Sequence, residues 1–516
     1  MRPTIAQKLQ DRKSQVQSRI EHRPGCYRDE PMFAASNIHF ELSDRSQAVS
    51  CGGVGLMFAV AQKLDLVQSI NDGLNLLRVH QPYSESDHVL NIAFNVLAGG
   101  TRLEHIERRR SDEAYLNAIG AIRIPDPTTS GDFCRRFKES DILKLMDIFN
   151  KKRVRVWKTQ PRSFFDEAFI DADGTLVETD ACKKEGVDIA YNGVWGYHPL
   201  VISLANTQEP LFIVNRSGNR PSHERAHEFI DESIELCLGA GFRKVCVRGD
   251  TDFTQTKHLD RWADLPNVSF VFGMDARANL IDIAENLPAD AYSLLRRPSR
   301  HKARTKPRSK RHDVKKRIVR EREFENITLE EEQVAEFSYK PTACRRSYRV
   351  VALRKKLGIE KGQMRLLDEY RYYFYITNRY DLSTREVVFL ANDRCDQENL
   401  LAQLKGEMRA LSSPVDNLES NWAYMVMASL AWSLKAWAAL LMTEDGRDEQ
   451  EKDRRRSEKR KLLRMEFTTF RAAIIDIPCQ IVRSGRRLIY RVLTWWSPWL
   501  DSFFEIADRV QFSRLC

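Results

Sequence analysis

Apolar and polar positions follow two different periods along the chain. Up to about residue 160, apolar side chains recur at helical intervals, as in 54–66 and 88–97, and predict a mostly helical region. From residue 164 onward, short apolar runs bounded by turn residues predict strands. The predicted order is three strands, a helix, a strand, a helix and a strand, at 169–175, 198–205, 211–215, 222–238, 244–248, 258–263 and 268–274.

This element order is that of the RNase H-like fold, so we expect an α/β protein with such a core. In that fold the first and fourth strands are neighbours at the sheet centre, and acidic residues at their ends converge. A cationic stretch followed by β-rich pieces predicts an insertion that interrupts the core. The expected regions are a mostly helical N-terminal region (1–160), the first part of the core (161–275), a basic β-rich insertion (276–385), the second part of the core with an acidic helix (386–443) and a basic amphipathic C-terminal region (444–516).

The segment from Trp422 to Met442 is mostly apolar and about long enough to span a bilayer. However, Lys435 lies inside this run, and three tryptophans are spread along it instead of gathering at its ends. We therefore predict a buried core helix and no membrane partner.

Charge is unevenly distributed. The formal net charge is +10, but residues 296–322 hold fourteen Lys/Arg and two Asp/Glu, a local +12 that leaves about −2 for the remainder. Such a block attracts polyanions. Ten cysteines without a C-x-x-C pair argue against zinc fingers and a disulfide framework, and favour a reducing cytoplasm.

Two acidic strand ends carry candidate chemistry, at Asp171 with Asp173 and at Asp250 with Asp252. Side chains alternate along a strand, so the members of each pair share a face, and spacing alone does not say which one binds metal. A third carboxylate, Glu398, lies on a predicted helix. Three carboxylates reached in the order strand, strand, helix suit a two-metal phosphoryl-transfer site, because Mg²⁺ takes hard oxygen ligands.

The third carboxylate belongs to a spaced pattern. Arg394, Glu398 and Lys405 follow Ala391 at intervals of three, four and seven residues. On one continuous helix, positions 394, 398 and 405 fall on the same side, so two cations flank the carboxylate. The alternative is that Arg394 and Glu398, four residues apart, form an ordinary ion pair on the surface of a helix.

These intervals resemble the Y(2)R(3)E(6)K signature of DDE transposases of bacterial insertion sequences, with Ala391 in place of the tyrosine. Asp173-Gly-Thr175 and Gly249-Asp250 resemble that family's first and second acid motifs, and Tyr191 through Leu200 is similar to the insertion-sequence family thirteen-eighty. The resemblance runs from about 164 to 441.

The resemblance implies roles for these residues. Asp173, Asp250 and Glu398 would be catalytic and hold two Mg²⁺ ions, with Mn²⁺ as a substitute, while Asp171 and Asp252 stay candidates for groups that contact these ligands. Arg394 and Lys405 would contact DNA. The same resemblance implies the partners: inverted-repeat DNA ends, target DNA and a second copy of the chain in a homodimer. The protein would act in the bacterial cytoplasm and associate with the nucleoid when bound to DNA.

A basic segment in the N-terminal region is a further DNA-binding candidate. We expect Ser130 or a neighbouring threonine to cap a helix whose first turns carry Arg135, Arg136 and Lys138. Such a helix either lies on DNA phosphates or presents a solvated face.

Two other functions have to be weighed. A decayed transposase that binds DNA without cleaving it would have the same fold, although the presence of all three acids argues against it. His223-Glu224-x-x-His227 matches the zinc metalloprotease pattern, in which two histidines one helical turn apart bind the metal. Arg220, Arg225 and Glu228 crowd that motif with charge, and no third ligand is evident.

Overall fold

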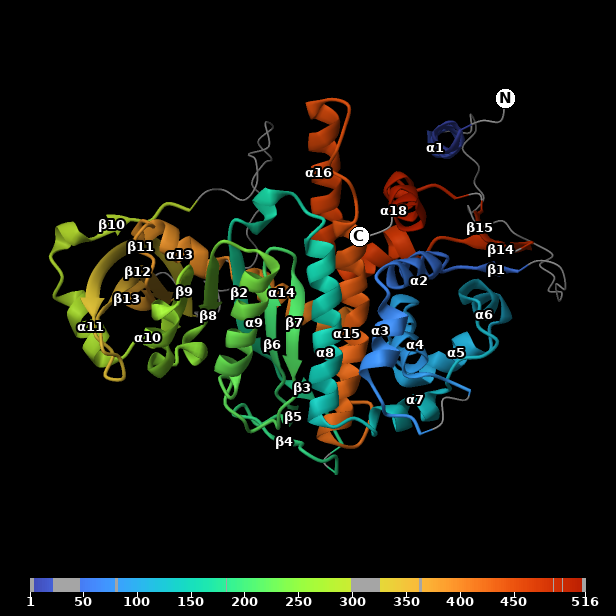
Figure 1. Cartoon of the computed structure of the whole chain (residues 1–516). Helices are drawn as coiled ribbons and strands as arrows, with labels where there is room; N and C mark the ends of the chain where they lie inside the picture. Colours follow the sequence, from blue (N-terminus) through green and yellow to red (C-terminus); the bar gives the residue numbers. More distant parts are fainter. Residues whose placement is uncertain are drawn as a thin grey trace.

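The computed structural model describes residues 4–21, 47–78, 82–181, 183–297, 325–361, 364–485, 487–493 and 495–512. Its largest element is a nine-stranded mixed sheet (Figure 1). In spatial order the strands are β10 (Ser293–Leu294), β11 (Glu325–Tyr339), β12 (Tyr348–Lys361), β13 (Met364–Thr377), β9 (Val268–Met274), β8 (Val245–Gly249), β2 (Ala168–Gly174), β6 (Leu200–Leu204) and β7 (Glu209–Val214).

The centre of the sheet is parallel and its flanks are antiparallel. β2 pairs with β8 and β8 with β9 in parallel, whereas β6 and β7 continue antiparallel on the other side of β2. These five strands and the helices between them lie where the apolar runs predict, because each run is bounded by turn residues that end its ladder. The first and fourth predicted strands are therefore direct neighbours.

Helices cover both faces of the sheet. α9 (Ala226–Ala240) and α10 (Thr256–Asp264) contact one face, where Val245 and Val247 join the main core. α13 (Thr384–Asn392) contacts the other face, where Cys246 packs in a second cluster with Val387 and Val388. The alternation of side chains along β8 thus separates the two layers.

The Trp-rich segment forms α15 (Leu418–Leu440), a helix that is buried over nearly its whole length between α8 (Glu139–Trp157), α4 (Glu85–Leu97) and β7 (Figure 1). Its indole N–H groups bond to the sheet, as in the 2.9 Å contact of Trp437 Nε1 with Glu209 Oε1. Within the described ranges it is the one helix that passes a membrane test of length and composition. The predicted core helix is confirmed.

The two ends of the described chain pack together. β1 (Ala48–Val49) pairs with β14 (Cys479–Ser484), which pairs with β15 (Arg487–Val492), and α18 (Leu500–Phe512) contacts α2 (Gly53–Lys63). The other helices of these regions are α1 (Ile5–Glu21), α3 (Leu66–Gly73), α5 (Ile106–Arg110), α6 (Glu113–Ile119), α7 (Pro127–Cys134), α16 (Glu449–Arg464) and α17 (Phe467–Phe470).

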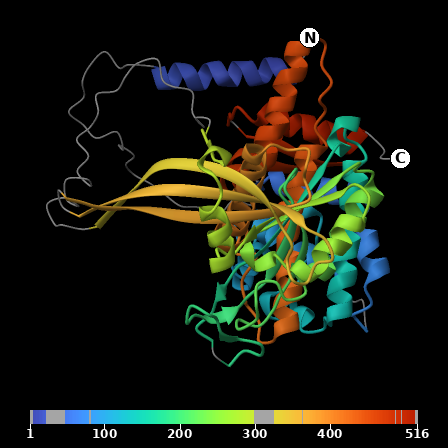
Figure 2. The ribbon, with the colours of Figure 1, turned by 90° about the vertical axis from the view of Figure 1, so that its left-hand side faces the viewer.

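The β-rich stretch between β9 and α13 continues the sheet. β13 pairs antiparallel with β9 from Phe374 opposite Met274 to Thr377 opposite Val271. With β11 and β12 it forms a long three-stranded ribbon that extends away from the body of the molecule (Figure 2). Of the cationic block at 296–322, all but Arg296 and Arg297 lies outside the described residues.

Candidate active site

Two of the predicted carboxylates lie at the ends of neighbouring parallel strands. The register of β2 and β8 aligns Asp171 with Arg248, so Asp173 and Asp250, each two residues further on, reach the same edge of the sheet. Asp250 Oδ1 accepts a hydrogen bond from the Asp252 backbone N–H at 3.0 Å. This bond orients Asp250 at the start of the short 3₁₀ turn Thr251–Phe253.

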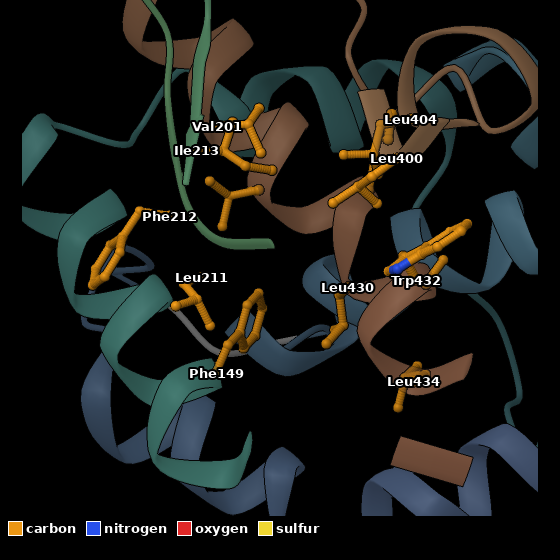
Figure 3. Close-up of a cluster of buried hydrophobic side chains, with 14 of the residues drawn as sticks. Phe149, Val201, Leu211, Phe212, Ile213, Leu400, Leu404, Leu430, Trp432 and Leu434 are labelled. Carbon is orange, nitrogen blue, oxygen red and sulfur yellow. The ribbon is translucent and has the colours of Figure 1, made fainter. Parts of the chain in front are cut away.

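Buried contacts of α14 (Cys395–Ala402) position the third carboxylate. Gln397 is buried, and its Nε2 donates to the Val201 carbonyl of β6 at 3.0 Å while its Oε1 accepts from Ser203. Leu400 and the following Leu404 belong to the cluster of buried side chains drawn in Figure 3. Glu398 thereby faces outward, with 63% of its side chain exposed.

Arg394 lies among the three carboxylates. Its Nη1 donates to Asp173 Oδ2 at 2.8 Å, and its Nη2 lies 3.8 Å from Asp250 Oδ2 and 3.9 Å from Glu398 Oε1. The Arg394 side chain is only 16% exposed, so these contacts are poorly screened. One guanidinium therefore contacts all three predicted metal ligands.

Burial and mutual repulsion disfavour the negative charges of this cluster. Burial raises the pKa of Asp173 to about 6, against the lowering effect of Arg394, and nearby Asp250 raises it further. Burial likewise raises the pKa of Asp250. For Arg394, burial acts to lower the pKa, but the charges of Asp173 and Asp250 outweigh it and raise the pKa. The acids thus gain from any cation placed among them.

The second member of each acidic pair has a different partner. Asp171 is fully buried and accepts two hydrogen bonds from Arg248, at 2.7 and 2.8 Å. Arg248 also donates to the Leu390 carbonyl of α13 at 3.1 Å, so this ion pair ties the sheet to the helix before the site. Asp252 accepts from Ser222 Oγ at 2.8 Å instead.

Sequence reasoning missed Arg248 and Gln397. A signal for Arg248 is present, because a lone cation inside the apolar strand Val245–Gly249 requires a buried acid as its partner. Gln397 carries no such signal, since its partners Ser203 and Val201 lie nearly two hundred residues away in the sequence.

The prediction of one continuous helix through the signature residues is wrong. α13 ends at Asn392, Arg394 lies in the turn before α14, and Lys405 lies in a π-helical segment, Gln403–Glu407. The chain turns because α13 packs beside β9 and β11–β13 whereas α14 packs on β2. Ala391 is half-buried against the second core cluster and lies on a different helix from Glu398.

Lys405 lines a surface cavity of about 570 Å³. The cavity lies between residues 101–104 of the N-terminal helical region, residues 177–180 and residues 405–414, and three of its lining residues are the exposed cations Arg102, Lys405 and Arg409. Its other lining residues are Thr101, Glu104, Val177, Glu178, Thr179, Asp180, Leu411, Ser412, Ser413 and Pro414.

The prediction of a helix that is capped near Ser130 and carries cations in its first turns is also wrong. Asp126 caps α7, accepting from the Thr129 N–H at 2.8 Å, with Pro127 in the first turn. The helix ends at Cys134, so Arg135 and Arg136 follow it instead of occupying its first turns. Arg135 pairs with Asp132 and Asp416, both at 2.8 Å.

The geometry contradicts the metalloprotease pattern. α9 begins at Ala226, so His223 and Glu224 lie in the preceding turn and only His227 is helical. His227 stacks on His258, with ring centroids 4.3 Å apart. Two histidines one helical turn apart, which that chemistry requires, are therefore not formed.

Asp173, Asp250 and Glu398 fit a divalent cation by their chemistry. All three supply hard carboxylate oxygens, and their shared contact with Arg394 shows that they converge. Across the described ranges, no group of three or more His, Cys, Asp or Glu is arranged tightly enough to hold a metal as it stands. In this cluster the Arg394 guanidinium contacts each of the three carboxylates.

The chain was compared with family models, curated sequences and solved structures. The family model described as "Transposase DDE domain group 1" matches residues 35–514. No curated protein sequence matches the chain. A cryo-EM structure described as the piggyBac transposase synaptic complex with hairpin DNA is 10% identical, with 82% of this chain and 81% of that chain covered and a TM-score of 0.34.

Proposed function

The chain belongs to the transposase DDE domain family, group 1, and on that premise we propose that it is an insertion-sequence transposase whose active site is Asp173, Asp250 and Glu398. The observation that carries this assignment is the shared contact of the three carboxylates with Arg394, at 2.8, 3.8 and 3.9 Å. Residues separated by more than two hundred positions converge there, in a family defined by three acids.

We propose that the core is RNase H-like and that the stretch 276–385 is the insertion typical of such transposases. The strand order β7-β6-β2-β8-β9, with β2, β8 and β9 parallel, supports the first part. The extension of the sheet by β13, β12 and β11 is compatible with the second. Among such transposases, we propose that this chain belongs with the bacterial insertion-sequence family thirteen-eighty.

The proposed reaction is phosphoryl transfer at the transposon end. A water oxygen bonds to the scissile phosphorus as the 3′ oxygen leaves, which gives a free 3′-OH and a 5′-phosphate. The 3′-OH then attacks a second phosphodiester and displaces its 3′ oxygen, so no covalent protein–DNA intermediate forms. When bound, two Mg²⁺ ions supply activation of the nucleophile and neutralisation of developing charge.

The chain's own residues hold and orient the reactants. Asp173 is fixed by its buried strand and by the Gly174 N–H, which donates to Oδ1 at 2.8 Å. Glu398 is exposed on α14, so DNA bound at this surface would reach its carboxylate. Arg394 and Lys405 would contact backbone phosphates, and the cavity beside Lys405 would take one strand near the cleaved end. Arg135 and Arg136 would add contacts within a homodimer bound to two ends.

A strand-cleavage assay tests the proposal. The element's ends are first identified by sequencing the flanks of the gene, and the full chain is incubated with an end duplex in Mg²⁺. We expect nicking at the end that stops with a chelator and returns with Mg²⁺ or Mn²⁺ but not with Zn²⁺. Specific end binding without any nicking in either metal would identify a non-cleaving DNA-binding protein instead.

A further inference from the structure

The position of Arg394 has a consequence for the order of binding. Asp173 Oδ2 is occupied by Arg394 Nη1 at 2.8 Å and Asp173 Oδ1 by the Gly174 N–H at 2.8 Å. The second guanidinium nitrogen faces both Asp250 and Glu398. A divalent cation that binds the same carboxylates therefore competes with this guanidinium, because two positive charges held this close repel each other.

The charges of the three carboxylates are also not balanced by Arg394. Three carboxylates against one guanidinium leave the cluster with a formal charge of −2, whereas the adjacent Asp171 pairs one to one with Arg248. Arg394 reduces the repulsion between the acids and keeps them together, but it does not neutralise them. The site is thus stabilised in a form that still attracts cations.

A change of partner by Arg394 needs only a rotation of its side chain. It lies in the two-residue turn between α13 and α14, where the helical hydrogen-bond ladder is interrupted, so its guanidinium can move without unwinding either helix. The natural alternative partner is a phosphate oxygen pair, because the planar fork of Arg binds phosphate in the same bidentate geometry as carboxylate.

We propose that Arg394 is a positioning residue that occupies the acid cluster until a DNA backbone phosphate draws it away, so that DNA and divalent metal bind cooperatively. This inference rests on the proposed function, since it takes the three acids to be the metal site. Metal affinity is low in the free protein and rises when DNA is bound. By linkage, metal raises DNA affinity by the same factor.

Mn²⁺ binding, measured by electron paramagnetic resonance without DNA, tests the proposal on the full chain. Arg394→Gln removes the charge while keeping similar length, and we expect about tenfold tighter Mn²⁺ binding, within the usual range of coupling between sites. Arg394→Lys keeps the charge but loses the fork, and we expect a smaller gain. The matched control is Arg379→Gln, whose arginine pairs with Glu167 and Asp381 away from the cluster and whose loss should leave Mn²⁺ affinity unchanged.

A second comparison adds an end-DNA duplex. The duplex should tighten Mn²⁺ binding to the wild type by about tenfold and to Arg394→Gln far less. Unchanged or weaker Mn²⁺ binding in both folded Arg394 variants overturns the inference. The Asp173→Asn/Asp250→Asn double variant separates this failure from failure of the proposed function: if it binds Mn²⁺ as the wild type does, the acids are not the metal site at all.

Discussion

Two groups of arginine and carboxylate side chains in this molecule differ in burial and in their balance of charge. Arg153 of α8 and Glu209 of β7 form an ion pair at 3.0 Å in the core, with side chains 2% and 0% exposed. Arg394 and its three acids lie at the sheet edge, where Glu398 is 63% exposed. The first group has one cation for one anion, and the second has one cation for three.

The hydrogen bonds of the core pair are completed by neutral groups. Arg153 Nη2 donates to the Pro210 carbonyl at 2.7 Å, and Glu209 accepts from the indole N–H groups of Trp157 and Trp437, both at 2.9 Å. Such a pair is fixed, because every partner is buried and satisfied. In the acid cluster, one guanidinium does not balance the charge of three carboxylates. The excess negative charge attracts further cations. The matched pair is thus complete without a further ion, whereas the unmatched cluster keeps a charge that attracts one.

The largest expected effect is on catalysis at the unmatched cluster. Asp173→Ala, Asp250→Ala and Glu398→Ala should each lower strand cleavage by roughly a thousandfold or more, because each removes a metal ligand from a reaction that depends on charge neutralisation. End binding, measured by gel shift, should change little. Near-normal cleavage by any one variant in Mg²⁺ would remove that residue from the site.

Breaking the matched pair should act on stability instead. Arg153→Met leaves Glu209 buried without its cation, which costs about 3–5 kcal/mol in comparable buried pairs. We expect a lower free energy of unfolding in urea, while Mn²⁺ affinity of the remaining folded protein is unchanged. A stable Arg153→Met variant with altered metal binding would erase the distinction between the two groups.

Lys435 offers a third case, a buried cation with only neutral neighbours to hold it. Its Nζ donates to the Leu463 carbonyl at 2.8 Å and lies 3.9 Å from the Trp432 ring centroid. Burial lowers the pKa of Lys435 to about 7. Because the unfolded chain binds this proton up to its ordinary pKa near 10.4, the free energy of unfolding should rise with pH between about 7 and 10.

The Lys435→Met variant tests that dependence. The lysine contributes a slope of at most about 1.4 kcal/mol per pH unit in this window, and its replacement should flatten the profile and stabilise the protein at pH 7 and below. Urea unfolding at several pH values measures this. An unchanged slope would mean that Lys435 is charged in the folded protein and that neutral partners suffice for a buried cation.

The central sheet was predictable from sequence because its signals are local. Each of β2, β6, β7, β8 and β9 is a short apolar run between turn residues, and α15 is an apolar run too rich in tryptophan and too interrupted by Lys435 for a bilayer. The positions of Asp173 and Asp250 at one edge of the sheet were predictable for the same reason, since each ends such a run.

The arrangement around Glu398 was not predictable, because it depends on tertiary contacts. The helix breaks after Asn392 so that α13 and α14 can pack on different strands, and no glycine or proline marks that break. The helical spacing of the sequence predicts that Arg394 lies beside Glu398, as the structure has it. It does not predict the contacts of Arg394 with Asp173 and Asp250. The cap of α7 was missed because Asp126, four residues before Ser130, precedes a proline that is itself the better helix start.

The smallest expected effect concerns Lys405 and Arg409, two cations that line the surface cavity. If Lys405 and Arg409 each contact one phosphate, Lys405→Gln and Arg409→Gln should each reduce the slope of log K against log salt by about 0.9 for duplex DNA. The loss should be similar on unrelated sequences, because phosphate contacts carry no sequence information. Lys452→Gln on α16, whose lysine pairs with Glu449, is the control and should leave the slope unchanged. An unchanged slope in both test variants would mean that DNA does not enter the cavity lined by Lys405.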